Sequence, residues 1–224
     1  MSEPAGDGSG GAFQGPSAGL AALVVGVATD LLEHRDELNR LDGVAGDGDL
    51  GLTLTTAAKA LIELAPALAA LPEADAIRKC GTEIARRAPS TGGTLIAFAL
   101  MAAAKATVDP GAPSIERAAA YLEAGASSIT QRGHVEPGDR TMLDALAPAA
   151  EAVRSAVVDG KAAGAAARAA AAAADEGATS TATMAAKVGR AGWLAERAAG
   201  HVDAGARLVA LAFAAAARSL DVEG

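Results

Sequence analysis

The 224-residue sequence contains little of what several protein classes require. It has one cysteine, Cys80, so an intrachain disulfide or a cysteine zinc cage is excluded and a reducing, cytoplasmic setting is expected. Aromatic residues make up 2% of the chain, which leaves few platforms on which nucleic-acid bases stack. The net charge is −8, with 19 basic residues scattered among 27 acidic ones. We therefore expect no nucleic-acid partner.

Long apolar runs are also missing. The stretches 94–104 and 208–217 are shorter than the roughly 18 residues that a membrane span needs. The apolar stretch 18–29 follows a segment with two acidic residues and no basic one, unlike a secretory signal. We expect no membrane segment, a flexible tail over residues 1–16 and a single domain over 17–224.

Strand signals are nearly absent, because β-branched and aromatic residues are few and do not alternate. Alanine, the best helix former, supplies more than a quarter of the chain. The sequence therefore predicts an all-α protein. The expected helices cover 17–41, capped by Ser17, then 52–71 with a bend or break at Pro66, 73–87, 94–107, 114–131, 140–157, 161–175 and 205–220.

Glycine gathers in four segments, at 43–51, 89–93, 133–138 and 189–205. They separate the first helix from the second, the third from the fourth, the fifth from the sixth and the seventh from the eighth. In an up-and-down bundle, alternate connections lie at the same end. We expect these four loops to meet at one rim and to form a ligand site there.

The first loop places Asp42, Asp47 and Asp49 among glycines. Crowded carboxylates repel unless a cation joins them, and an all-oxygen set suits a hard ion such as Mg²⁺. An EF-hand is rejected, because counting from Asp47 puts Ala58 where the bidentate glutamate belongs. The alternative is a solvated acidic turn.

The second loop contains Ser90, Thr91, Gly92 and Gly93 just before a predicted helix, where free N–H groups attract phosphate. The same residues are also typical of an ordinary helix cap. No P-loop motif occurs, so a P-loop ATPase is excluded. Three arginines of the third and fourth loops are either phosphate partners or solvent-facing residues: Arg132, Arg140 and Arg190. No chemistry is assigned to the three histidines, Tyr121 or Trp193.

Taken together, four motifs resemble the nucleotide-binding L subunit of dihydroxyacetone kinase, which also forms the C-terminal half of single-chain dihydroxyacetone kinases. The resemblance covers about residues 17–220. The motifs are LNRLDGVAGDGDLG at 38–51, PSTGGTL at 89–95, GHVEPGDRTMLDALAPAAEA at 133–152 and TATMAAKVGRAGWLAERAAGHVDAGA at 181–206.

This resemblance implies a barrel of eight antiparallel up-and-down helices that holds ADP or ATP at one rim through two Mg²⁺ ions. It implies Asp42, Asp47 and Asp49 as metal ligands and assigns no further catalytic residue. The implied nucleotide contacts are Leu50, Gly51, Leu52, Thr53, Thr91, Gly92, Gly133, Met142, Arg190, Asp203, Ala204 and Gly205.

Several positions depart from the family pattern. Leu50 stands where His, Cys or Thr is usual, so its contact is apolar or through the backbone. Gly92 replaces a serine, Arg140 a lysine and Ala204 a proline.

The implied function is a Mg-dependent phosphotransferase subunit that acts on a short keto-sugar held by a separate K subunit. The phosphoryl donor is ATP or a phosphohistidine carrier protein that recharges a bound ADP. Two alternatives remain: a non-catalytic module that holds nucleotide and docks a partner, and a domain of the fatty-acid kinase type.

Overall fold

The computed structural model describes residues 13–188 and 195–221, and in these ranges its regular secondary structure is entirely helical. The all-α prediction is confirmed. The elements are α1 (Ala18–Glu33), α2 (Arg35–Ala45), α3 (Leu50–Ala69), α4 (Glu73–Arg87), α5 (Thr91–Ala103), α6 (Ser114–Gly133), α7 (Leu143–Val158), α8 (Ala163–Ser180), the 3₁₀ turn η1 (Thr181–Thr183), α10 (Ala195–Ala198) and α11 (Ala204–Asp221).

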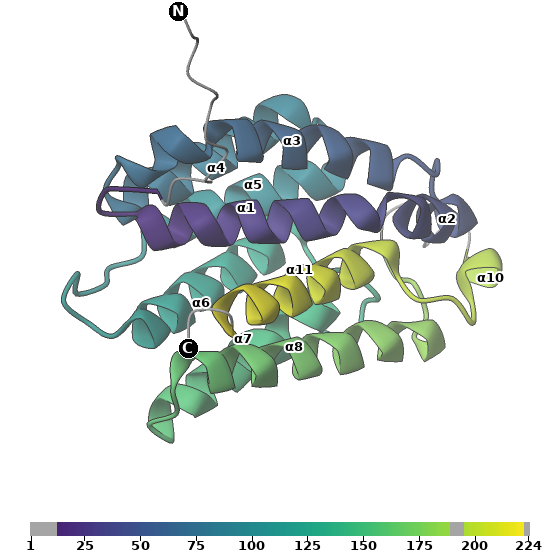
Figure 1. The fold of residues 1–224 in the computed structure, drawn as a ribbon. Coiled ribbons are helices and arrows are strands. Elements are labelled where there is room, and N and C mark those ends of the chain that lie inside the picture. The colour runs from purple at the N-terminus through teal and green to yellow at the C-terminus, as the bar shows by residue number, and fades with distance from the viewer. Residues whose placement is uncertain (1–12, 189–194, 222–224) are drawn as a thin grey trace, which may run out of the picture.

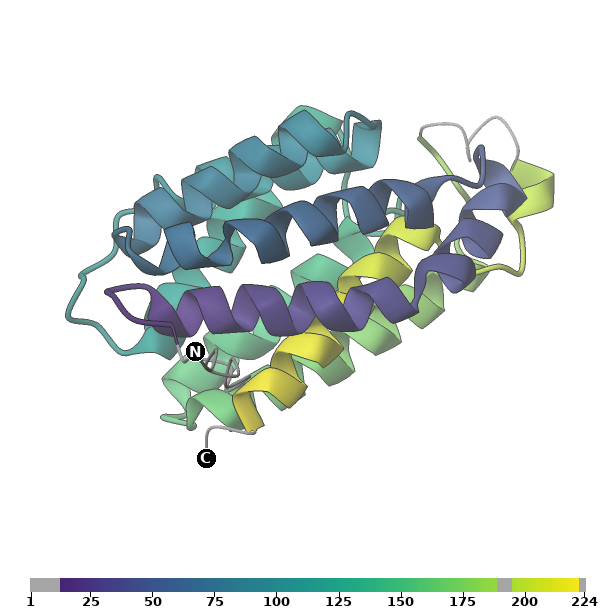
Figure 2. The ribbon, with the colours of Figure 1, turned by 45° about the horizontal axis from the view of Figure 1, so that its top comes forward.

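Eight of these helices form a closed ring (Figures 1 and 2). Each packs against the next in the order α1, α3, α4, α5, α6, α7, α8 and α11, and α11 returns to contact α1. Successive helices run in opposite directions along the ring. This is the predicted barrel of eight antiparallel helices. The short helices α2 and α10 lie next to each other at one end.

The predicted continuous helix over 17–41 is wrong, because the chain turns at His34 (φ −97°, ψ 9°). The His34 amide donates to the Leu31 carbonyl at 3.2 Å. This bond spans three residues, as in a 3₁₀ turn, whereas an α-helical bond spans four. The turn lets Leu38, fully buried, pack with Leu208 and Leu211 of α11. No glycine or proline marks the break, so packing produces it.

The start of α1 also differs from the prediction. The Ser17 hydroxyl does not cap the helix; it donates to the Leu71 carbonyl at 2.7 Å and ties α1 to the end of α3. Pro66 lies within α3, which continues to Ala69.

Alanine makes the contacts where α7, α8 and α11 meet. The buried residues of α8 are Ala166, Ala170, Ala174 and Ala178, one every four positions. This spacing places them on one face of the helix, and their small side chains let the neighbouring backbones approach closely. The last three of them pack with Ala145 and Ala149 of α7 and Ala206 and Ala210 of α11. The alanine-rich segment is therefore a packed helix.

One described helix, α3, is long and apolar enough to cross a membrane by length and composition alone. In this structure it is one wall of the barrel and packs against α1, α2 and α4. Its buried residues include Ala57, Ala65 and Leu68.

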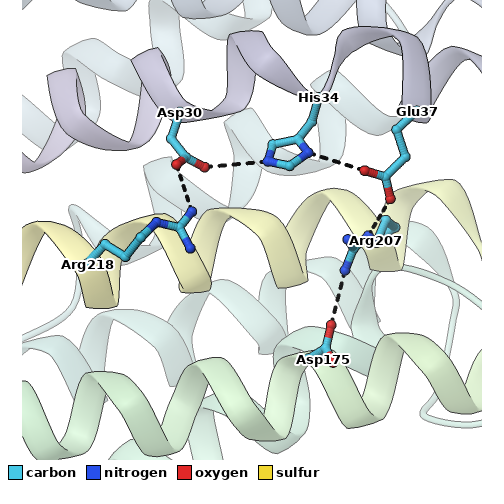
Figure 3. Close-up of polar contacts among 6 residues, drawn as sticks. All are labelled: Asp30, His34, Glu37, Asp175, Arg207 and Arg218. Atoms are coloured by element: carbon cyan, nitrogen blue, oxygen red, sulfur yellow. Dashed lines mark hydrogen bonds and ion pairs between the residues drawn. The ribbon is translucent and has the colours of Figure 1, made fainter.

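Charged side chains fix α2 to the barrel (Figure 3). Arg207 of α11 contacts Glu37 of α2 at 2.7 Å and Asp175 of α8 at 3.0 Å. The His34 ring lies between Glu37, at 3.2 Å, and Asp30, at 3.7 Å. Arg218 pairs with the other oxygen of Asp30 at 2.7 Å. The Arg207–Glu37 pair holds α2 against α11, and the other arginine pairs join α11 to α8 and α1. Helix α2 carries the first acidic residue of the site described next.

Candidate functional site

The end of the barrel where α2 and α10 are drawn, at the right of Figure 2, carries the connections α2–α3, α4–α5 and α6–α7 and the described parts of the connection between α8 and α11. We call this end the rim. A Cβ added to Gly92 would lie 3.7 Å from Met142, and one added to Gly205 would lie 3.5 Å from it. Met142 therefore lies where the second, third and fourth loops meet. The convergence expected from alternate connections is found for these loops.

Three carboxylates gather at the rim between α2 and α3. Asp42, Asp47 and Asp49 each offer an oxygen atom, and these atoms lie within 4.8 Å of one another. Asp42 is half-buried in the last turn of α2, whereas the other two are exposed. Asp49 directly precedes α3, where the positive end of the helix dipole favours a negative charge.

Backbone amides hold Asp42 in place. Its Oδ2 accepts hydrogen bonds from the amides of Gly48, at 2.8 Å, and Asp49, at 3.0 Å. Gly48 has φ +77°, a left-handed conformation that glycine adopts easily. A Cβ on Gly46 would lie 2.3 Å from the Asp42 carboxylate. The glycines therefore let the chain fold tightly around this side chain.

The donor set fits Mg²⁺. All three side chains supply oxygen, the ligand that this ion prefers, and within the described residues no other group of His, Cys, Asp or Glu has ligand spacing. Ligand oxygens of one octahedral Mg²⁺ are about 2.9–4.2 Å apart, given Mg–O distances near 2.1 Å. A separation of at most 4.8 Å needs only small side-chain rotations to reach this range.

Asn39 is a residue that the sequence analysis missed. It lies one helical turn before Asp42, and its side-chain oxygen accepts hydrogen bonds from the amides of Gly51, at 2.7 Å, and Leu52, at 3.3 Å. Both amides belong to the first turn of α3, where no intrahelical acceptor is available. The sequence did contain a signal for this residue. Asn39 lies three positions before Asp42, a spacing that places two side chains on the same face of a helix.

The predicted contacts that follow the acidic loop differ in exposure. Leu50 is half-buried and packs beside Leu31 and Leu38 in the core, so an apolar residue suits this position. Gly51 is buried and Leu52 is 62% exposed. Thr53 is half-buried, one turn into α3.

In the second loop, Ser90 caps α5. Its hydroxyl accepts a hydrogen bond from the Gly93 amide at 3.0 Å, and the helix begins at Thr91. The interpretation as a helix cap is confirmed, and α5 starts three residues before the predicted 94. Thr91 is exposed and Gly92 half-buried at the positive end of α5, so both face the rim at a helix N-terminus.

Arg140 of the third loop has a structural role. It is only 4% exposed, and its guanidinium donates to three carbonyl groups, those of Thr181 at 3.1 Å, Ala198 at 2.6 Å and His201 at 2.7 Å. These bonds fasten the fourth loop to the start of α7. The prediction that Arg140 is either a phosphate partner or a solvent-facing residue is therefore wrong. Arg132 is exposed and lies over the Phe98 ring at 4.0 Å.

Asp144 explains why α7 begins at Leu143 and not at 140. Its buried carboxylate accepts hydrogen bonds from the amides of Gly138, at 2.5 Å, and Thr141, at 2.7 Å. These bonds shape the turn in which Arg140 adopts φ +62°. Of the predicted contacts here, Met142 is 8% exposed and packs in the core, and Gly133 is the half-buried last residue of α6.

In the fourth loop, Asp203 caps α11. Its Oδ1 accepts a hydrogen bond from the Ala206 amide at 2.8 Å, and its own amide donates to the buried hydroxyl of Thr181 at 2.8 Å. Burial raises the pKa of Asp203 to about 6, and the nearby Arg140 guanidinium opposes that shift. Ala204 is buried and Gly205 half-buried. Arg190 and Trp193 lie outside the described residues.

The family model for the DAK2 domain matches residues 44–218. The chain belongs to the DAK2 domain family. The match includes Asp47 and Asp49 and extends into α11. This domain of the DhaL type is thus similar to known kinases over most of the barrel.

Its relatives include complete enzymes and a separate subunit. It is 35% identical to D-erythrulose kinase of Mycolicibacterium smegmatis over 83% of this chain and 32% of that protein. It is 33% identical to the ADP-binding subunit DhaL of PEP-dependent dihydroxyacetone kinase of Escherichia coli, over 77% of this chain and 82% of that subunit. The DAK2 domain described here therefore spans about a third of the erythrulose kinase and most of the DhaL subunit.

Two solved structures of one kinase resemble this barrel. The native dihydroxyacetone kinase of C. freundii aligns with a TM-score of 0.70 and 29% identity, over 98% of this chain and 38% of that one. The same kinase in complex with AMP-PNP and Mg²⁺ aligns with a TM-score of 0.69 and 28% identity, over 98% and 37%. These likenesses identify the barrel as a nucleotide-binding domain of a kinase family.

Proposed function

We propose that this DAK2 domain binds ADP or ATP with Mg²⁺ at the rim and transfers a phosphoryl group to a short keto-sugar, such as dihydroxyacetone, held by a separate K subunit. The observation that carries the proposal is the cluster of Asp42, Asp47 and Asp49 oxygens within 4.8 Å of one another. The related kinase crystallised with AMP-PNP and Mg²⁺ supports it.

In this proposal the acidic loop holds the metal, two ions by the likeness to the family. Bound Mg²⁺ neutralises phosphate charge and orients the terminal phosphoryl group. The N-terminus of α5, with Thr91 and Gly92, attracts phosphate oxygens through its amides and dipole. Arg190 supplies positive charge, and Gly133, Met142 and the segment 203–205 contact the nucleoside. Met142 is 8% exposed, so only a small part of its side chain is available to contact adenine.

Nucleotide binding is tested by calorimetric titration. Mg-ADP and Mg-ATP are titrated into the protein, and the same nucleotides are titrated in EDTA. We expect binding that depends on the metal. A protein that binds neither nucleotide in the presence of Mg²⁺ would contradict the proposal.

Turnover separates a phosphotransferase from a docking module. Mixed with a K-type subunit, dihydroxyacetone and either Mg-ATP or Mg-ADP with a phosphorylated histidine carrier protein, the domain should form dihydroxyacetone phosphate. The productive mixture identifies the donor. Nucleotide binding without product in both mixtures would favour the docking module.

A further inference from the structure

We propose that Asn39 is the positioning residue of the acidic loop: it fixes the start of α3 so that Asp47 and Asp49 face Asp42. The inference rests on the proposed function, since it assigns a residue that prepares the same site. Asn39 is the only asparagine in the sequence, and it is neither a carboxylate nor one of the predicted nucleotide contacts.

The geometry places Asn39 and Asp42 on one face of α2, three positions apart. Asp42 binds the amides of Gly48 and Asp49, and Asn39 binds those of Gly51 and Leu52. Two neighbouring side chains of one helix thus hold the chain on both sides of the residue that begins α3. Leu50 lies between the two pairs of bonds. Asp49 is held directly by its own amide bond to Asp42 and, from two residues further along the chain, by the bonds of Asn39 to the first turn of α3.

The close fit of α3 on α2 supports this role. A Cβ on Gly51 would lie 2.0 Å from the Arg35 carbonyl oxygen and 2.9 Å from the Asn39 side-chain oxygen. Gly51 is therefore required for the contact between the two helices. At this distance the Asn39 oxygen reaches two amides that the helix itself leaves without an acceptor.

The chemistry of the side chain also matters. An amide oxygen accepts both hydrogen bonds without adding a fourth negative charge beside three carboxylates. The amides of Gly51 and Leu52 are engaged by Asn39, so contacts of these residues with a nucleotide use other atoms. Groups that orient metal ligands from outside the coordination sphere typically change metal affinity by about 10–100-fold when removed.

The first experiment needs no ligand. Amide hydrogen exchange of Gly51 and Leu52 is measured by NMR in the full chain, for the wild type and for Asn39→Ala. We expect exchange at least about tenfold faster in the variant at these two amides, with unchanged exchange in the middle of α3. Equal protection in both proteins would overturn the inference.

The second experiment measures Mn²⁺ affinity in the presence of ADP by electron paramagnetic resonance of free Mn²⁺. Asn39→Ala should weaken the affinity at least about tenfold. Asn39→Asp keeps an acceptor oxygen at the same position but adds a negative charge that itself attracts Mn²⁺, so it is read in the exchange experiment. We expect it to restore the exchange rates of the Gly51 and Leu52 amides to within about threefold of the wild type. Exchange as fast as in Asn39→Ala would contradict a role as acceptor.

A matched control separates positioning from general stability. Ser17→Ala removes a buried hydrogen bond between a side chain and a carbonyl at the opposite end of the barrel. It should lower the Tm without changing the affinity for Mn²⁺ and ADP. An equal loss of affinity in this control would overturn the inference. If the wild type itself binds no Mn²⁺ and ADP, the proposed function fails, while the exchange experiment still decides the role of Asn39.

Discussion

Replacing Asp47 and Asp49 together with asparagine should leave the ligand-free protein folded and abolish its stabilisation by Mg-ADP. Asparagine keeps the size and the hydrogen-bonding capacity of each side chain but removes two of the three negative charges of the cluster. Asp42 remains and still accepts the amides of Gly48 and Asp49. General damage to the fold would lower the Tm of the ligand-free variant, whereas loss of the site removes only the shift that the ligand causes.

The magnitude follows from the spacing of the carboxylates. Unit charges 4.8 Å apart repel by about 0.9 kcal/mol in water, and the variant removes all three such pairs. Screening at about 0.15 M salt reduces the total to roughly 1.5 kcal/mol. Loss of the Asp49 charge at the N-terminus of α3 costs about 0.3–1 kcal/mol. Asp47 also has an interaction partner, whose loss opposes the relief of repulsion. The opposing contributions should keep the Tm of the ligand-free variant within roughly 4 °C of the wild type in a chain of this size.

Ligand binding gives the second effect. A ligand at about a hundredfold excess over its Kd stabilises the native state by about 2.7 kcal/mol, or roughly 5–10 °C here. The wild type should show this shift only with Mg²⁺ and ADP together, because the metal removes the carboxylate repulsion that opposes phosphate. The variant should show none.

The assay is thermal unfolding followed by circular dichroism, with EDTA, Mg²⁺, ADP in EDTA, and Mg-ADP. The control is Glu33→Gln with Glu63→Gln, which removes the same charge from two exposed residues away from the cluster. This control should keep the full shift with Mg-ADP. A variant that keeps the shift, or a wild type whose Tm rises equally with ADP in EDTA, would refute the three-carboxylate site.

Three further substitutions test the rim. Arg140→Ala leaves three carbonyl groups without their buried donor. We expect the free energy of unfolding in denaturant to fall by about 2–3 kcal/mol and amide hydrogen exchange to become faster around residue 198. An unchanged midpoint of denaturant unfolding would contradict the structural role. Gly51→Ala places a Cβ 2.0 Å from the Arg35 carbonyl oxygen, and the shift that it forces should cost about 1–3 kcal/mol, seen as a lower Tm. The pKa of Asp203 is raised from 3.8 to about 6 by burial, so the protonated form favours the folded state and wild-type stability is lost as the pH rises from about 4 to about 6. Asp203→Asn should remove this pH dependence and stabilise the protein at pH 7; a stability profile as steep as that of the wild type would exclude Asp203 as its source.

Local patterns determined most of the helices. Helix α4 has the bounds that its sequence predicts, because Pro72 precedes it and an amphipathic pattern continues to Arg87. The arrangement of glycine loops at one rim follows from alternation along an up-and-down chain, which requires no knowledge of side-chain contacts. The acidic cluster was also predictable, since Asp42, Asp47 and Asp49 are close in sequence and glycines between them allow a tight loop.

Only the tertiary structure decided the break at His34 and the roles of Asn39 and Arg140. The residues around His34 are good helix formers, and the chain turns there because Leu38 gains burial against α11. Arg140 binds carbonyl groups up to 61 positions away in the sequence, and Asn39 binds an amide 12 positions away. Backbone donors and acceptors are the same in every residue, so nothing in the sequence marks which of them a distant side chain will meet. Packing of the barrel brings these groups together, and this packing turns a helix-forming sequence into a shaped rim.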